Sequence, residues 1–293
     1  MRVATLEVDL RTGAVEANLK AVLAGVRAAA ARGSELVALP EMWPTSFVAG
    51  ATDSDYAASD QAVRRLAEVT EELPITAVGS AFGPRLEEAP GIASLPTNRA
   101  HVLRRGRVEV WYDKVHLFSP TAEHLAFRAG TEPPPVMQLP VRSGEPVKIA
   151  PVVCYDLRFP EVARAAFRGG AEVLVVVAQW PDSRAAHWKA LLRGRAAELE
   201  GFVVASNRIG VDEIGRRRMR LSFGGHAAVV GPSGEDVEVA DRATLRRDGD
   251  DDGALGEATK LSVQEIDLEE ARALRRAVPV LKDERRELYR GWG

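Results

Sequence analysis

Short, continuous apolar runs alternate with segments of helical periodicity along much of this chain. The runs at 36–39 and 173–177 are too short for helices and are typical of strands buried on both faces of a sheet. The first run follows a segment in which Leu19, Val22 and Val26 recur at helical spacing. Because buried strands alternate with helices, we predict a sheet covered by helices and therefore an α/β fold class.

Turn and proline signals predict further elements. Extended runs at 99–103 and 108–112 flank a basic connection that contains glycine, which indicates a hairpin. Pro151 removes one ladder donor from the strand expected at 147–153, so we expect an edge, a bulge or an unpaired position there. Ser59 is interpreted as the cap of a helix that follows it.

Bulk composition narrows the class of protein. The 293 residues are 46% apolar and 28% charged, which is ordinary for a folded globular protein, and no linker or fixed-period repeat divides them. We therefore predict one domain over residues 1–293. The net charge of -3 gives no reason to expect nucleic acid or an anionic membrane as a partner. No apolar stretch approaches the ~18 residues of a membrane span, and the N-terminus lacks a secretory signal, so we expect a cytoplasmic protein.

The sequence contains no complete motif for a metal or a cofactor. Residues 248–253 begin like a calcium-binding loop, but the twelfth position is Thr259 instead of glutamate, so we interpret this acidic stretch as a mobile loop of unassigned role. The five histidines show no zinc-type spacing, and no glycine-rich phosphate loop follows a strand. The basic run at 216–220 is interpreted as a solvated loop or a subunit contact. We expect neither a metal nor a cofactor.

The only cysteine, Cys154, stands at the end of an apolar run and is followed by a turn and by Pro160 and Glu161, which open a helix. The sulfur is therefore expected at the carboxyl end of a strand. A nearby cation or helix N-terminus would lower the thiol pKa from about 8.5 and favour the nucleophilic thiolate. A buried inert cysteine and a redox-sensing thiol remain the alternatives.

Two further polar residues, Glu41 and Lys114, also stand at the ends of extended runs. Acyl transfer from an amide uses a thiol nucleophile, a cation or donors for the oxyanion, and an acid that protonates the leaving amine. A buried glutamate serves as that acid and base if its pKa rises from about 4.3. Taken singly, each of these two residues has a surface or structural role as its alternative.

Three stretches of the chain resemble signatures of the nitrilase superfamily of carbon–nitrogen hydrolases. They are Ala38-Leu39-Pro40-Glu41, Tyr112-Asp113-Lys114-Val115-His116-Leu117-Phe118 and Cys154-Tyr155-Asp156-Leu157-Arg158-Phe159-Pro160-Glu161. Resemblance extends to Asn98, His187-Trp188, Arg195-Ala196 and 279–289. It implies a four-layer α-β-β-α sandwich with two central sheets. It also implies Glu41 as general base and acid, Lys114 as oxyanion stabiliser and Cys154 as nucleophile, with Glu123 as a second glutamate.

Within that superfamily, Tyr155-Asp156 replaces the Trp-Glu that usually follows the cysteine of nitrilases proper, which indicates an amidase. The segments at 179–181 and 187–188 are similar to omega-amidases, which hydrolyse the terminal amide of 2-oxoglutaramate or 2-oxosuccinamate. Leu199-Glu200 and Ala227 depart from the usual pattern and put the fine specificity in doubt.

Substrate contacts are expected from four residues: Tyr155, Trp180, Arg184 and His187. Arg184 is the first candidate to bind a substrate carboxylate, because the planar guanidinium suits that group. Arg158 is interpreted instead as a brace of the cysteine turn through a salt bridge to Asp156 or Glu161.

The sequence thus predicts an amidase that converts the terminal carboxamide of a small acid to acid and ammonia through a cysteine thioester. Hydrolysis of an N-carbamoyl or deaminated-peptide amide is the alternative within the superfamily. A non-catalytic interaction protein on the same scaffold, or a Cys-His hydrolase that uses His116 or His187, are alternatives of other kinds. The expected partner is a small-molecule amide, and the resemblance suggests a homodimer or a larger homo-oligomer.

Overall fold

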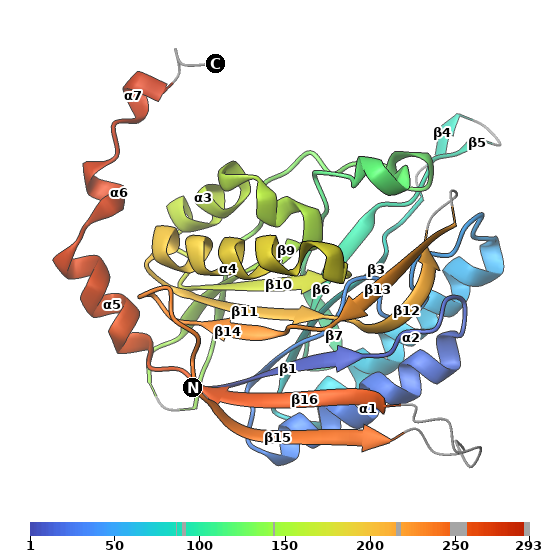
Figure 1. Cartoon of the computed structure of the whole chain (residues 1–293), viewed down its shortest axis with the longest axis horizontal. Helices are drawn as coiled ribbons and strands as arrows, with labels where there is room; N and C mark the ends of the chain where they lie inside the picture. The colour runs from blue at the N-terminus through green and yellow to red at the C-terminus, as the bar shows by residue number, and fades with distance from the viewer. Residues whose placement is uncertain (86, 90–91, 143, 215–217, 247–256, 290–293) are drawn as a thin grey trace.

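Two stacked β-sheets dominate the computed structural model, which describes residues 1–85, 87–89, 92–142, 144–214, 218–246 and 257–289 (Figure 1). In spatial order, the larger sheet contains β15 (Val239–Arg246), β16 (Glu257–Glu265), β1 (Arg2–Val8), β2 (Leu36–Ala38), β3 (Thr76–Phe82), β6 (Asn98–Arg104) and β7 (Arg107–Asp113). The smaller sheet contains β14 (Ala228–Val230), β11 (Phe202–Asn207), β10 (Val173–Ala178), β9 (Val147–Val153) and β8 (Met137–Leu139). The loop expected at 248–253 lies outside the described residues.

Helices cover the outer face of each sheet. α1 (Val15–Ala31) and α2 (Asp53–Glu72) lie on the larger sheet, and α3 (Pro160–Arg168) and α4 (Ala185–Leu199) lie on the smaller one. One apolar cluster joins α1 and α2 to the larger sheet, with Leu6 fully buried in it. The predicted α-β-β-α order of layers is confirmed.

A second apolar cluster fills the space between the sheets. It brings Val3 and Val78 of the larger sheet together with Val152 and Val176 of the smaller one, and it extends to Trp188 on α4. These side chains are at most 1% exposed. Full burial of a valine or leucine side chain stabilises a fold by about 1.5–3 kcal/mol, so this layer holds the sheets face to face.

Parallel strands in both sheets point their carboxyl ends toward a common edge. β1, β2 and β3 are parallel neighbours in the larger sheet, and β9, β10 and β11 are parallel neighbours in the smaller one. The backbone N–H of Glu41, just after β2, donates to the carbonyl of Ala178 at the end of β10 at 3.3 Å. The two sheets therefore bring the chain segments that follow their strands into direct contact.

The structure confirms the predicted hairpin and the position of Pro151 but not the predicted helix cap. β6 and β7 form the predicted hairpin. Pro151 pairs with Val175 of β10, but β8 pairs with β9 only at 147–149, so the proline occupies the expected unpaired position. The cap assigned to Ser59 is wrong, because α2 begins at Asp53 and Thr52 caps it in a capping box with Asp55. The sequence Thr52-Asp53-Ser54-Asp55 carries the signal for this capping box.

Smaller elements complete the described chain. They are the strand pairs β4 (Glu87–Ala89) with β5 (Ile92–Ala93) and β12 (Ile209–Ile214) with β13 (Met219–Gly224), the 3-10 turns η1 (Ser119–Thr121), η2 (Glu123–Leu125), η3 (Cys154–Arg158) and η4 (Asp182–Arg184), and the helices α5 (Leu268–Ala277), α6 (Val280–Asp283) and α7 (Arg286–Tyr289). In Figure 1 the last three helices run along one side of the molecule, where Ala271 of α5 is buried in the second apolar cluster. Among the described helices, none has the length and apolar character that crossing a membrane requires.

Candidate active site

Cys154 is the first residue of η3, directly after β9, and its backbone is left-handed with φ of +44°. Non-glycine residues adopt this conformation only where surrounding structure holds them there, which is common at functional sites. The residue is 8% exposed and lines a pocket, and its sulfur lies 3.9 Å from the carbonyl oxygen of Gln179, toward which the thiol donates. The strained turn therefore presents the sulfur to the pocket instead of burying it in the sheet.

The pKa of Cys154 differs from the sequence-based expectation. Burial and the adjacent Glu41 carboxylate raise the pKa well above its ordinary value, and the positive charge of Lys114 only partly opposes this. The expectation of a lowered thiol pKa is therefore wrong for the free protein. A thiol that stays protonated needs a neighbouring base when it attacks.

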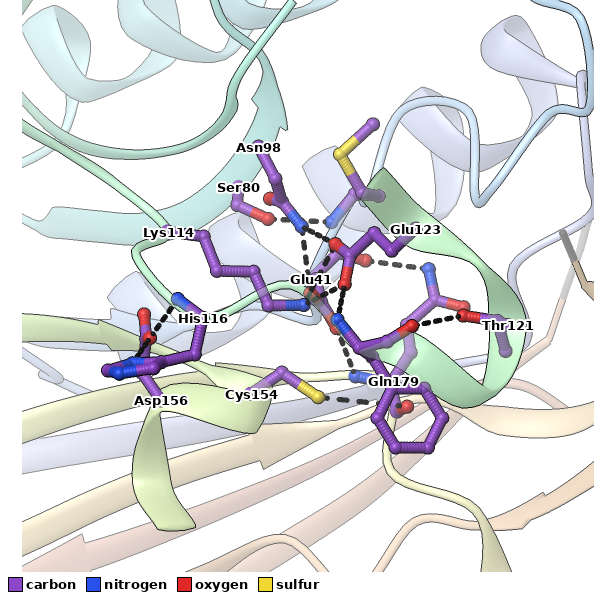
Figure 2. Close-up of polar contacts among 12 residues, drawn as sticks. Glu41, Ser80, Asn98, Lys114, His116, Thr121, Glu123, Cys154, Asp156 and Gln179 are labelled. Atoms are coloured by element: carbon purple, nitrogen blue, oxygen red, sulfur yellow. Dashed lines mark hydrogen bonds and ion pairs between the residues drawn. The ribbon is translucent and has the colours of Figure 1, made fainter. Parts of the chain in front are cut away.

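Glu41 provides a carboxylate at the base of the same pocket and is 1% exposed. Its Oε1 accepts hydrogen bonds from Lys114 Nζ and from Asn98 Nδ2, both at 2.8 Å. Its Oε2 accepts from the backbone N–H of Gln179 at 3.0 Å (Figure 2). Burial raises the pKa of Glu41, the charge of Glu123 adds to this, and Lys114 partly offsets it.

Lys114 follows β7 and is likewise 1% exposed. Its ammonium donates to Glu41 at 2.8 Å and to both carboxylate oxygens of Glu123, at 2.9 and 2.8 Å. Burial alone would lower the pKa of Lys114, but the charges of Glu123 and Glu41 outweigh it and raise the pKa well above its ordinary value. The site therefore keeps a fixed cation between two carboxylates.

Glu123 opens η2 and is buried, which excludes the alternative reading of this glutamate as a surface loop residue. Besides the lysine contacts, Oε2 accepts from the backbone N–H of Phe118 at 2.6 Å, and Oε1 lies 3.3 Å from Asn98 Nδ2. Figure 2 shows the carboxylates of Glu123 and Glu41 next to the lysine head group. The carboxylate of Glu123 thus ties the segment after Lys114 back onto the ammonium.

The pocket above these groups is lined by most of the residues predicted to contact substrate. Tyr155, Trp180 and Arg184 line it together with Cys154. His187 is absent from the lining, and its Nδ1 lies 3.3 Å from Nη2 of Arg158.

The bracing role assigned to Arg158 is wrong. Its side chain lines the pocket, and its guanidinium carbon lies 4.7 Å from the centre of the Trp180 ring. Arg158, Asp156 and Glu161 are all described residues, and no ion pair joins Arg158 to either carboxylate. The carboxylate of Asp156 is instead occupied by other donors, with His116 among them. The pocket therefore presents two guanidinium groups, those of Arg158 and Arg184.

Sequence reasoning missed several residues of the pocket. Gln179 contacts both Glu41 and Cys154, and its position directly after a buried strand was the available signal. The hairpin of β12 and β13 contributes an apolar wall formed by Ile214, Leu221 and Phe223. Nothing in local sequence indicates that this hairpin faces the cysteine, because more than fifty residues separate them.

Comparison with known proteins assigns the chain to a family. The carbon–nitrogen hydrolase family matches residues 2–276. The chain is 30% identical over 260 residues to a hydrolase in the agr operon of Staphylococcus aureus, which covers 87% of each chain. It is 32% identical over 209 residues to an omega-amidase of Escherichia coli (strain K12), which covers 71% of this chain and 73% of that one.

A solved structure gives the same assignment. A glutamate mutant of the amidase from Nesterenkonia sp. AN1, with the acetamide moiety of fluoroacetamide added covalently at its active site cysteine, superimposes with a TM-score of 0.77. Sequence identity is 27%, and the alignment covers all of this chain and 97% of that one. Together with the family match over nearly the whole length, this makes the chain a member of the carbon–nitrogen hydrolase family and an amidase of the nitrilase superfamily.

Proposed function

We propose that this amidase hydrolyses the terminal carboxamide of a small acid, such as 2-oxoglutaramate, to the acid and ammonia through a thioester on Cys154. The observation that carries the proposal is the meeting of a thiol, a buried carboxylate and a buried ammonium at the base of a pocket that also presents two guanidinium groups. The similarity to an omega-amidase supports the same substrate class.

In the proposed acylation step, Glu41 takes the proton of the Cys154 thiol as the sulfur attacks the amide carbon. The negative charge that develops on the amide oxygen is stabilised by Lys114 and by the backbone N–H of Tyr155, the residue after the nucleophile. Collapse of the tetrahedral intermediate breaks the C–N bond, and Glu41 returns its proton to the leaving nitrogen. Ammonia leaves and the acyl group remains on sulfur as a thioester.

In the proposed deacylation step, water attacks the thioester carbon and gives a proton to Glu41. The C–S bond then breaks, the acid leaves, and the thiolate of Cys154 recovers the proton from Glu41. Glu123 keeps the Lys114 ammonium in place through two hydrogen bonds during both steps. The raised pKa of Glu41 suits this use, because a carboxylate whose pKa lies closer to neutrality both accepts and returns a proton readily.

The free carboxylate of an omega-amide substrate is proposed to bind Arg158, Arg184 or both. Each guanidinium rests near an aromatic ring, Arg158 near Trp180 at 4.7 Å and Arg184 near Phe118 at 5.5 Å. A guanidinium that lies over an aromatic ring can still donate from its edge to a carboxylate, although Nη2 of Arg158 already contacts His187. An anionic group at one end of the substrate would thereby direct the amide at the other end to the sulfur.

A screen of small terminal amides, read by ammonia release, tests the proposal with the wild-type protein and Cys154→Ala. The wild-type protein is expected to release ammonia from 2-oxoglutaramate, and the variant is expected to release none while keeping its circular dichroism spectrum and melting temperature. Mass spectrometry of the protein treated with fluoroacetamide should find the added group on Cys154. Ammonia release by the folded variant at the wild-type rate would refute the thioester mechanism, and carbon dioxide released with ammonia would indicate N-carbamoyl substrates instead.

A further inference from the structure

Asp156 is a fully buried carboxylate two residues after Cys154. It accepts a hydrogen bond from the Tyr112 hydroxyl at 2.8 Å, from the backbone N–H of His116 at 2.8 Å and from that of Val115 at 3.3 Å. The His116 ring nitrogen Nδ1 lies a further 2.8 Å from Oδ1 (Figure 2). Burial of a carboxylate is costly unless hydrogen bonds compensate for the lost water, and here four contacts do so.

The partners of Asp156 share one property, which is that they flank Lys114 on both sides. Tyr112 lies two residues before the lysine, and Val115 and His116 follow it directly. The backbone of Lys114 is itself held by two hydrogen bonds, from its N–H to the Asn98 carbonyl at 2.9 Å and to its carbonyl from Gly130 at 2.8 Å. The side chain of Asp156 is therefore a direct link between the turn that carries the thiol and the segment that carries the ammonium.

The His116 ring strengthens this link. It stacks on Phe159 with 3.6 Å between ring centres and 8° between planes, so it contacts the cysteine turn through both Asp156 and Phe159. Because an ionised carboxylate only accepts hydrogen bonds, the geometry places the His116 proton on Nδ1.

We propose that Asp156 is a positioning residue of the amidase reaction, which sets the Lys114 ammonium against the Cys154 sulfur by binding Tyr112, Val115 and His116. The inference rests on the proposed function for the roles of the lysine and the cysteine. It adds that Glu41 and Glu123 hold the ammonium itself, whereas Asp156 holds the chain immediately before and after the lysine. Misplacement of a catalytic group by about 1 Å lowers turnover by roughly 100-fold, so such a link matters for rate.

The test replaces Asp156 by Asn, which keeps the size of the side chain and turns one acceptor oxygen into a donor. We expect kcat to fall by roughly 100-fold with little change in KM, because Asp156 itself does not line the pocket. The second readout is the pH dependence of Cys154 alkylation by iodoacetamide without substrate. Since Lys114 lowers the pKa of Cys154 against the opposing effects of burial and Glu41, its displacement should move the alkylation profile to higher pH.

Two variants of His116 separate the hydrogen bond from packing. His116→Phe keeps a ring on Phe159 and removes the donor, whereas His116→Asn keeps a side-chain N–H near the position of Nδ1 and removes the ring. We expect His116→Phe to show the defects of Asp156→Asn in weaker form and His116→Asn to retain most of the activity. Asp236→Asn, at an exposed ion pair with Arg193 at 2.9 Å, is the matched control for the Asp-to-Asn change and should match the wild-type protein.

Circular dichroism gives the folded fraction of every variant, and each kcat is calculated per folded molecule. The inference is overturned if folded Asp156→Asn keeps the wild-type kcat and alkylation profile, or if His116→Phe and His116→Asn lose activity equally. Alkylation does not depend on amide turnover, so the link is assessed even if the proposed mechanism fails. Failure of the mechanism itself would appear as turnover that survives in Cys154→Ala.

Discussion

The carboxylate of Glu41 and the ammonium of Lys114 form a hydrogen-bonded ion pair at 2.8 Å in which both side chains are only 1% exposed. Both side chains are buried, so the charge of each residue shifts the pKa of the other and of the thiol beside them.

Glu41→Gln should remove the base while keeping the volume of the side chain. We expect kcat to fall by about 10²- to 10⁴-fold, the usual contribution of a general acid or base. Ammonia release measures this, and the melting temperature verifies the fold. Glu16→Gln, at an exposed ion pair with Arg65, is the control and should match the wild-type protein. Undiminished turnover by folded Glu41→Gln would rule out the proposed base.

Lys114→Met should destabilise the fold as well as abolish turnover. It leaves the carboxylates of Glu41 and Glu123 buried without their cation, and breaking a buried pair in this way costs about 3–5 kcal/mol. Urea denaturation measures the free energy of unfolding. Adding Glu123→Gln removes one of the two uncompensated charges and should recover part of the loss; if the double variant is less stable than Lys114→Met, the electrostatic explanation is wrong.

The acid limb of the kcat/KM profile should lie above pH 4.5, which is close to the ordinary pKa of a glutamate side chain. Burial and Glu123 raise the pKa of Glu41, and only its carboxylate form accepts the thiol proton. Activity is therefore present above the raised pKa and is lost as the pH falls through it. The pH of half-maximal kcat/KM is obtained from initial rates at low substrate concentration, measured over roughly pH 4 to 9. An inflection at or below 4.5 would contradict the assignment.

Arg158→Met and Arg184→Met should discriminate between charged and neutral amides. A charge-assisted hydrogen bond contributes about 1.5–3 kcal/mol, so loss of the guanidinium that binds the carboxylate should raise KM for 2-oxoglutaramate by roughly 10- to 100-fold. Hydrolysis of propionamide, which has no carboxylate, should change little. Arg193→Met, at an exposed site, is the control. If kcat/KM fell equally for both substrates, the arginines would shape the pocket without binding the substrate carboxylate.

His101 should make the fold less stable in acid. Burial, and next the positive charge of Arg99, lower the pKa of His101 to about 4, and its Nδ1 has no hydrogen-bond partner among the described residues. The unfolded chain therefore binds this proton near pH 6.5 and the folded chain only near 4, so stability is present above 6.5 and is lost as the pH falls toward 4.

The size of that effect follows from the shift. Over this range the wild-type protein should lose about 3 kcal/mol of unfolding free energy through this residue. His101→Gln, which does not titrate, should show a flatter dependence of the unfolding free energy on pH in urea denaturation between roughly pH 7 and 4.5, a range that contains most of the expected loss. Parallel curves for the two proteins would show that folding does not lower the pKa of His101.

Sequence alone determined the order of elements and the chemistry of the central groups. Apolar runs and helical spacing report burial within one strand or helix, and this information is local. The same holds for the hairpin of β6 and β7 and for the unpaired position at Pro151, because turn and ladder rules act over a few residues. The resemblance of three short signatures supplied Glu41, Lys114, Glu123 and the four-layer order.

Only the tertiary structure decided which side chains meet. The link from Asp156 to His116, the guanidinium of Arg158 in the pocket and the contacts of Gln179 with Glu41 join segments 40 to 138 residues apart. Such contacts depend on how the two sheets stack and on how each turn leaves its strand, which periodicity does not encode. Protonation is decided in the same way: the thiol of Cys154 has a raised pKa because burial and Glu41 outweigh Lys114, a balance that exists only when the fold brings all three side chains together.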